Sequence, residues 1–215
     1  MASTEPVFAY LGPAGTYTDE AARAFAARLG IDEPNLFECA SFDEVFDCVD
    51  RGKCEFGVVA KENSLEGSVT ATLDNFSFKS SATILGEEVI DIHHCLVMHP
   101  DAKIEDVATV ASHAQGLAQC RRFLSERLPG RSTITTSSTA ESARLVMENP
   151  RVAGIANAFA AELYARASRS ARSRIISGIR RRSRSSAARG IPPCSPAIAT
   201  RPRSRCSCRW TAPAR

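Results

Sequence analysis

The sequence predicts a two-lobed α/β protein with mixed, mostly parallel sheets and flanking helices. Strand-like and helix-like segments alternate along residues 6–165, and repeated strand–helix units favour parallel sheets that are covered by helices. The alternation is interrupted at residues 82–100, where two strand-like stretches follow one another with no helix between them. This interruption predicts a second lobe, which we place at roughly residues 82–155.

The elements of the first part follow from apolar runs and helical periodicity. Short apolar runs predict buried strands at residues 7–12, 35–40 and 55–60. Segments with helical periodicity follow them, at residues 18–30, 41–52 and 69–78. In the second of these segments, Ser41 and Glu44 form an S-x-x-E capping box, and Gly52 marks the helix end.

The later part of the chain continues the same alternation after the interruption. Apolar runs predict strands at residues 107–113, 132–137 and 152–157. Helical segments follow directly, at residues 114–130, 138–150 and 158–165. Each strand is thus followed by a helix, which is the arrangement that parallel strands require.

Polar motifs stand at the points where four predicted strands end. They are Gly12–Thr18, Glu62–Ser68, Ser112–Gln115 and Ser137–Thr139. Ligands of such folds bind in the crevice at the carboxyl ends of the strands. A turn or a helix cap would explain each motif taken alone, but their recurrence at successive strand ends favours a binding site.

The side chains in these motifs suit a small anion. Asn63 offers a donor and an acceptor, Ser64 offers a hydroxyl, and Gln115 can donate its amide to a carboxylate. Ser138 and Thr139 add hydroxyls beside a helix N-terminus, where the helix dipole favours negative charge. Neutral donors of this kind predict a site for a carboxylate. We interpret His93, His94 and His99 as structural or solvated residues.

Composition excludes several other classes of protein. The eight Cys show no spacing typical of a metal site, and the start "MASTEPVFAY" lacks the pattern of a secretory signal. We therefore expect free buried thiols, no metal and a cytoplasmic location. No apolar stretch approaches the roughly 18 residues of a membrane span, so we expect no membrane partner.

The charge of the chain is divided sharply near residue 165. Residues 166–215 hold 14 of the 27 Lys and Arg and none of the 24 Asp and Glu, so the net charge is −11 for residues 1–165 and +14 for residues 166–215. This Arg/Ser/Pro/Ala-rich tail has too little apolar surface to offset the entropy of ordering, which predicts disorder. It fits either a shift of reading frame near residue 165, which we favour, or a natural tail that binds nucleic acid.

At this point the motifs resemble those of a known family. "YLGPAGTYTDEAA", "SFDEVFDCVDRGKCEFGVVAKENSLEGSVTATLD", "ILGEEVIDIHHCL", "SHAQGLAQCRRFL" and "SSTAESA" have the order and spacing of prephenate dehydratase. The resemblance covers about residues 7–165, so we take residues 1–165 as a catalytic domain. It implies a fold like that of type II periplasmic binding proteins, with the substrate in the cleft, and it makes a homodimer possible.

The resemblance also implies a reaction and a set of site residues. The expected activity is that of a carbon–oxygen lyase that converts prephenate to phenylpyruvate, with loss of water and CO₂, in phenylalanine biosynthesis and without a cofactor. The substrate-binding positions of the family map onto residues of this chain as follows: Asn63, Ser64, Gln115, Ser138 and Thr139.

The chain departs from the family pattern at its C-terminal side. The Thr-Arg-Phe motif, whose Thr usually has the role of general acid, is absent, as is the regulatory ACT domain. Ala60-Lys61 and Ala114 replace the usual Pro-Ile and Pro. The catalytic residue is therefore unidentified, and we expect impaired turnover. Two alternatives remain open: a small-carboxylate-binding module without catalysis, and a nucleic-acid-binding protein that uses its basic tail.

Overall fold

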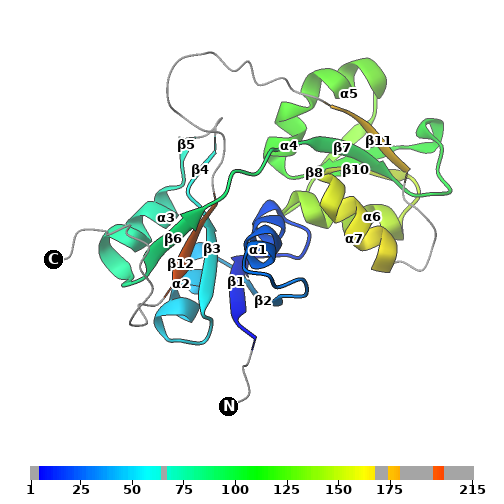
Figure 1. The fold of residues 1–215 in the computed structure, drawn as a ribbon. Helices are drawn as coiled ribbons and strands as arrows, with labels where there is room; N and C mark the ends of the chain where they lie inside the picture. Colours follow the sequence, from blue (N-terminus) through cyan, green and yellow to red (C-terminus); the bar gives the residue numbers. More distant parts are fainter. Residues whose placement is uncertain (1–4, 64–66, 168–173, 180–195, 201–215) are drawn as a thin grey trace. The chain divides into compact units, whose positions relative to one another are not determined.

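A computed structural model describes residues 5–63, 67–167, 174–179 and 196–200 (Figure 1). These residues form two compact units. The first contains the chain up to Gly12, residues 17–91 and the last strand, and the second contains residues 13–16 and 92–179. The predicted lobe of residues 82–155 is thus wrong at both ends, because the strand at residues 83–87 pairs within the sheet of the first unit.

The described strands of the first unit form a five-stranded sheet in the order β2-β1-β3-β12-β6. Strand β1 is parallel to β2 and β3, while β12 is antiparallel to both of its neighbours, β3 and β6. The strands have the following bounds: β1 (Val7–Leu11), β2 (Asn35–Cys39), β3 (Phe56–Ala60), β6 (Thr83–Glu87) and β12 (Pro196–Thr200).

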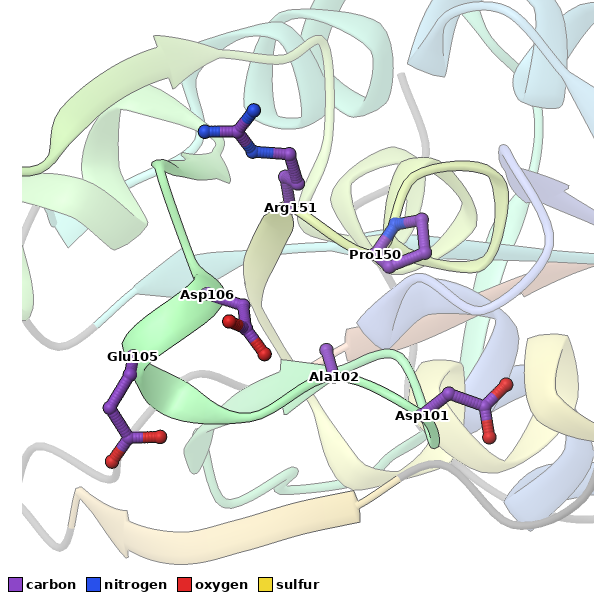
Figure 2. Close-up of a pocket in the computed structure, with 6 residues that line it drawn as sticks. All are labelled: Asp101, Ala102, Glu105, Asp106, Pro150 and Arg151. Atoms are coloured by element: carbon purple, nitrogen blue, oxygen red, sulfur yellow. The ribbon is translucent and has the colours of Figure 1, made fainter.

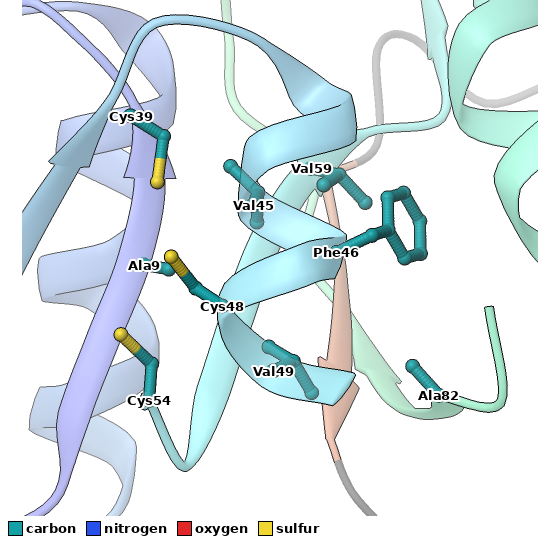
Figure 3. Packing of buried hydrophobic residues seen from close by; sticks show 9 residues of the cluster. All are labelled: Ala9, Cys39, Val45, Phe46, Cys48, Val49, Cys54, Val59 and Ala82. Atoms are coloured by element: carbon teal, nitrogen blue, oxygen red, sulfur yellow. The ribbon is translucent and has the colours of Figure 1, made fainter. Parts of the chain in front are cut away.

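Two helices cover opposite faces of this sheet. Helix α1 (Tyr17–Arg28) packs on Phe8 and Tyr10, whereas α2 (Phe42–Asp50) packs on Ala9, and successive residues of a strand point to opposite faces. Figure 3 shows the cluster beneath α2. Helix α2 has the predicted cap, because the Ser41 side chain accepts a hydrogen bond from the Glu44 backbone N–H at 3.2 Å.

The remaining elements of the first unit come between β3 and β6 in the sequence. A short hairpin pairs β4 (Glu62–Asn63) with β5 (Gly67–Ser68), and α3 (Thr70–Asp74) follows it. The predicted helix at residues 69–78 is therefore present, but it ends in a π-helical turn, Asn75–Lys79. The buried Thr72 hydroxyl donates to the Ala60 carbonyl at 2.7 Å, which ties this helix to the end of β3.

The described strands of the second unit form a sheet in the order β11-β7-β10-β8-β9. Strand β8 is parallel to β10 and β9, while β7 is antiparallel to β10 and β11 is antiparallel to β7. The strands have the following bounds: β7 (His94–Met98), β8 (Thr109–Ser112), β9 (Ser132–Thr135), β10 (Val152–Ala156) and β11 (Arg174–Ile179).

Helices also cover both faces of the second sheet. Residues of α4 (Ala114–Gln119) and α5 (Arg121–Arg127) pack with Val110 in one cluster, and α6 (Thr139–Glu148) and α7 (Ala158–Ala167) pack with Val97 in another. The single helix that the sequence predicts at residues 114–130 is two helices, because Cys120 has a ψ of 5° and interrupts the helical path.

The expectation of free buried thiols is confirmed for the cysteines in the described residues. These thiols form no disulfide and all are buried: Cys39, Cys48, Cys54, Cys95 and Cys120. Burial raises the pKa of Cys39 and of Cys54 to about 12, and the neighbouring Cys48 adds to both shifts. The Cys39 and Cys54 thiols, which lie beside α2 in Figure 3, are therefore protonated and poorly nucleophilic at neutral pH.

The prediction of a disordered tail is wrong at three places. Strands β11 and β12 both lie within residues 166–215, and α7 continues to Ala167. Strands pair through backbone hydrogen bonds, which do not depend on the side chains. The unpaired backbone groups at the edges of β3 and β6 can therefore be satisfied by a strand of almost any sequence. The rest of that prediction falls outside the described residues.

Strand β12 should therefore contribute to stability through its backbone. Ala199 lies between Gly57 and Ile84 in the sheet, and proline there would remove a backbone donor and leave its acceptor unpaired, at a cost of about 1–3 kcal/mol. We expect Ala199→Pro to lower the free energy of unfolding, measured with guanidinium chloride, by roughly that amount. Ala187→Pro serves as the control within the same tail. Equal unfolding midpoints for the two variants would show that β12 does not support the sheet.

Candidate functional site

The carboxyl ends of the parallel strands β8, β9 and β10 lie along one edge of the second sheet. Helices α4, α6 and α7 begin just after these strands, so their N-termini lie at this edge. The first N–H groups of a helix have no partner within the helix and carry the positive end of its dipole. This edge, which we call the carboxyl edge, is therefore suited to bind an anion.

A shared backbone acceptor fixes the geometry of the carboxyl edge. The Ser112 hydroxyl at the end of β8 donates to the Ile155 carbonyl of β10 at 2.8 Å. The Ser142 hydroxyl of α6 shares its proton between the same oxygen, at 3.0 Å, and the Thr139 carbonyl, at 2.7 Å. Both serines are fully buried. Ser112, which the sequence places in a binding motif, therefore joins two strands and a helix.

Gly116 brings the starts of α4 and α6 close together. A Cβ atom on Gly116 would lie 2.5 Å from the Ser112 Oγ and 3.6 Å from the Thr139 Cγ2. Only a residue without a side chain allows α4 to approach β8 this closely. The contact places two predicted binding residues, Gln115 and Thr139, at neighbouring helix starts.

Ser138 and Thr139 have different roles at the start of α6. The Ser138 Oγ accepts a hydrogen bond from the Glu141 backbone N–H at 3.0 Å, so Ser138 is the N-cap. The Glu141 carboxylate in turn accepts from the Ser137 hydroxyl and backbone N–H, and these bonds lower the pKa of Glu141. Thr139 is the first residue of the helix and is partly exposed, so its hydroxyl can approach a ligand.

Gln115 has a polar atom without a protein partner. The residue is partly exposed, yet its Nε2 is buried and makes no hydrogen bond within the described part of the chain. Leaving a buried amide donor unpaired costs about 1–3 kcal/mol. Such a donor indicates a place where a ligand or a water molecule binds.

The three histidines divide between the two predicted kinds, structural and solvated. His94 is only 9% exposed and so is not solvated, and its Nε2 lies 2.7 Å from the Gln119 Oε1. His93 is exposed. The His99 Nδ1 accepts a hydrogen bond from the Asp101 backbone N–H, as a structural residue would.

The remaining predicted residues belong to the first unit. Asn63 is partly buried in β4, where it pairs with Gly67, and Ser64 lies outside the described residues. Lys61, which departs from the family pattern, forms an ion pair with Glu87. The structure thus assembles Gln115, Ser138 and Thr139 in one unit, and it places Asn63 in the other.

A cavity of about 460 Å³ lies elsewhere in the second unit (Figure 2). Its lining includes Asp106, which precedes β8, and Arg151, which precedes β10, so it lies at the amino ends of these strands. None of the predicted site residues lines it. Within the described ranges, no group of three or more His, Cys, Asp or Glu could hold a metal ion, and no helix could span a membrane.

Two α/β units, with neutral hydrogen-bond donors at the carboxyl ends of strands, are typical of two-lobed proteins that bind small ligands. The family model of prephenate dehydratase matches residues 8–170, and the chain therefore belongs to the prephenate dehydratase family. A bifunctional chorismate mutase/prephenate dehydratase from Pseudomonas aeruginosa is 41% identical over 73% of this chain and 41% of its own length. The chain thus spans about two fifths of that relative.

Solved structures support the same family. The prephenate dehydratase of Arthrobacter aurescens in complex with L-Phe has a TM-score of 0.69 and 26% identity, over 92% of this chain and 61% of its own. GqqA, described as a novel type of quorum quenching acylase, has a TM-score of 0.69 and 25% identity, over 93% of this chain and 65% of its own chain. These likenesses and the two units confirm the predicted two-lobed, periplasmic-binding-protein-like α/β fold.

The contact between Gly116 and Ser112 can be tested by a double-mutant cycle. In the parent chain, Gly116→Ala should cost about 1–3 kcal/mol of unfolding free energy, because the added methyl group overlaps the Ser112 Oγ. In a Ser112→Ala background that oxygen is gone, and the same substitution should cost less than about 1 kcal/mol. Urea unfolding of the four chains measures both values. Additive effects would mean that the two residues do not limit the approach of α4 to β8.

Proposed function

We propose that this chain binds prephenate and belongs to an enzyme that converts it to phenylpyruvate in phenylalanine biosynthesis. The observation that carries the proposal is the match of the prephenate dehydratase family to residues 8–170. The carboxyl edge supports it, because three helix N-termini and the donor atom of Gln115 meet there. The reaction removes the ring hydroxyl as water and one carboxylate as CO₂, and it forms an aromatic ring.

The chemistry of the site suits the two carboxylates of prephenate. Thr139 and Gln115 are neutral donors, and hydrogen bonds from such donors to a carboxylate are charge-assisted and therefore strong. The resemblance adds Asn63, whose amide is a further neutral donor. Binding the substrate in this way requires no strong base.

We further propose that this chain catalyses the reaction slowly. The family pattern assigns the general acid to the Thr of a Thr-Arg-Phe motif, and this sequence contains no such motif. Its nearest match, Thr200-Arg201, is followed by Pro202. Thr200 pairs with Phe56, at the amino end of β3, whereas Asn63 follows the carboxyl end of that strand. Thr200 is thus not positioned to replace the missing residue.

Substrate binding can be tested by substitution of the proposed donors. Thr139→Ala and Asn63→Ala should each weaken prephenate binding by about 1–3 kcal/mol, because each removes a charge-assisted hydrogen bond. Isothermal titration calorimetry gives the dissociation constants. Thr133→Ala, at an exposed position of β9, is the control. Unchanged affinity in both test variants would remove these residues from the site.

Turnover can be tested by restoring the reading frame. We expect phenylpyruvate formation by this chain to be at least about 10²-fold slower than by a chain translated in the alternative frame after about Ala165, because a general acid contributes about 10²–10⁴-fold. The assay follows phenylpyruvate at saturating prephenate. Comparable rates would show that residues other than the missing Thr supply the acid. Binding of prephenate without turnover in either chain would favour a binding module.

A further inference from the structure

His94 lies at the carboxyl edge, although it comes from a different part of the sequence. Strand β7 runs antiparallel to β10, and Cys95 pairs with Ala156, the last residue of β10. The first residue of β7 therefore lies beside the ends of the parallel strands. His94 is 9% exposed, and its Nδ1 is one of two buried side-chain atoms without a hydrogen bond in the described part of the chain.

The orientation assigned to the Gln119 amide places the ring proton of His94 on Nε2. The His94 Nε2 lies 2.7 Å from the Gln119 Oε1, and a carbonyl oxygen can only accept a hydrogen bond. Burial lowers the pKa of His94, so the ring is neutral at neutral pH. A neutral ring with its proton on Nε2 has a lone pair on Nδ1. His94 therefore has a buried acceptor that no described residue satisfies.

The second buried atom without a partner, the Gln115 Nε2, is a donor on the helix that carries Gln119. Gln115 lies one turn before Gln119 in α4, and residues four apart on a helix are neighbours. Its buried Nε2 needs an acceptor, just as the His94 Nδ1 needs a donor. Carboxylates and ketones only accept hydrogen bonds, whereas a hydroxyl both donates and accepts. The Gln115 donor fits a carboxylate, as proposed above, whereas the His94 Nδ1 acceptor fits a hydroxyl and neither a carboxylate nor a ketone.

We infer that the His94 Nδ1 accepts a hydrogen bond from a hydroxyl group of the bound ligand. The inference rests on the proposed function for the identity of that ligand. Prephenate has two carboxylates, a ketone and one hydroxyl, and the hydroxyl is the group that leaves as water. His94 would thus orient the leaving group, while the helix N-termini bind the carboxylates.

Two substitutions distinguish the role of the His94 Nδ1 from that of the His94 Nε2. In His94→Gln the amide takes the position of Nε2, so the contact with Gln119 is kept and the acceptor is lost. In His94→Asn the amide takes the position of Nδ1, so the acceptor is kept and the contact with Gln119 is lost. We expect His94→Gln to weaken prephenate binding about tenfold, since it removes one buried hydrogen bond, and His94→Asn to weaken it less. His93→Gln, at the exposed neighbouring position, is the control.

The product provides a test of the hydroxyl itself. Phenylpyruvate has no ring hydroxyl, so His94→Gln should leave its dissociation constant unchanged in calorimetry. An equal loss for prephenate and phenylpyruvate, or a larger loss in His94→Asn than in His94→Gln, would make His94 a structural residue only. Failure of the parent chain to bind prephenate would instead overturn the proposed function, and with it the identity of the ligand.

A measurement on the parent chain avoids any effect of substitution on folding. The ¹⁵N NMR signals of the imidazole report which nitrogen is protonated and whether the other accepts a hydrogen bond. We expect the Nε2-protonated form without ligand, and a shift of the Nδ1 signal with prephenate but not with phenylpyruvate. A proton on Nδ1, or equal shifts with both ligands, would contradict the inference. An Nδ1 signal that prephenate leaves unchanged would show that water alone occupies this position.

Discussion

The carbonyl oxygen of Ile155 is the constraint on which the geometry of the second unit depends. It accepts hydrogen bonds from Ser112 and Ser142, and so it fixes the end of β8 and the first turns of α6 to β10. The Ser112 side chain then sets how closely α4 can approach, through its contact with Gly116. Two helix starts are thus held at one edge of the sheet by groups that are themselves fully buried and cannot contact a ligand.

The two ends of the second sheet differ in chemistry. The cavity at the amino ends is lined by three acidic residues and one arginine, and a negative ligand would be repelled by those carboxylates. The carboxyl edge has helix N-termini and neutral side chains, which favour an anion without adding a counter-charge. The chemistry of the side chains therefore favours the carboxyl edge for prephenate over the cavity at the amino ends.

The sequence predicts most of the fold, because hydrophobic periodicity and capping residues are local signals. It predicts the strand–helix alternation, the cap at Ser41 and the motif at Ser138 and Thr139. It does not reveal the contacts of Ser112 and His94, because only pairing between distant strands shows that Ser112 bonds to Ile155 and that His94 lies beside the end of β10. Strands β11 and β12 also escape prediction. Their pairing depends on open sheet edges elsewhere in the chain, and not on a pattern of their own.

The central claim is that a small carboxylate ligand binds at the carboxyl edge of the second sheet. Hydrogen–deuterium exchange with and without prephenate tests it directly, because bound ligand slows exchange of the amides it contacts. We predict slower exchange at residues 113–116 and 139–141, and no change at residues 101–106 and 151. Protection at residues 101–106 and 151 alone would place the ligand in the cavity at the amino ends, and it would contradict this account.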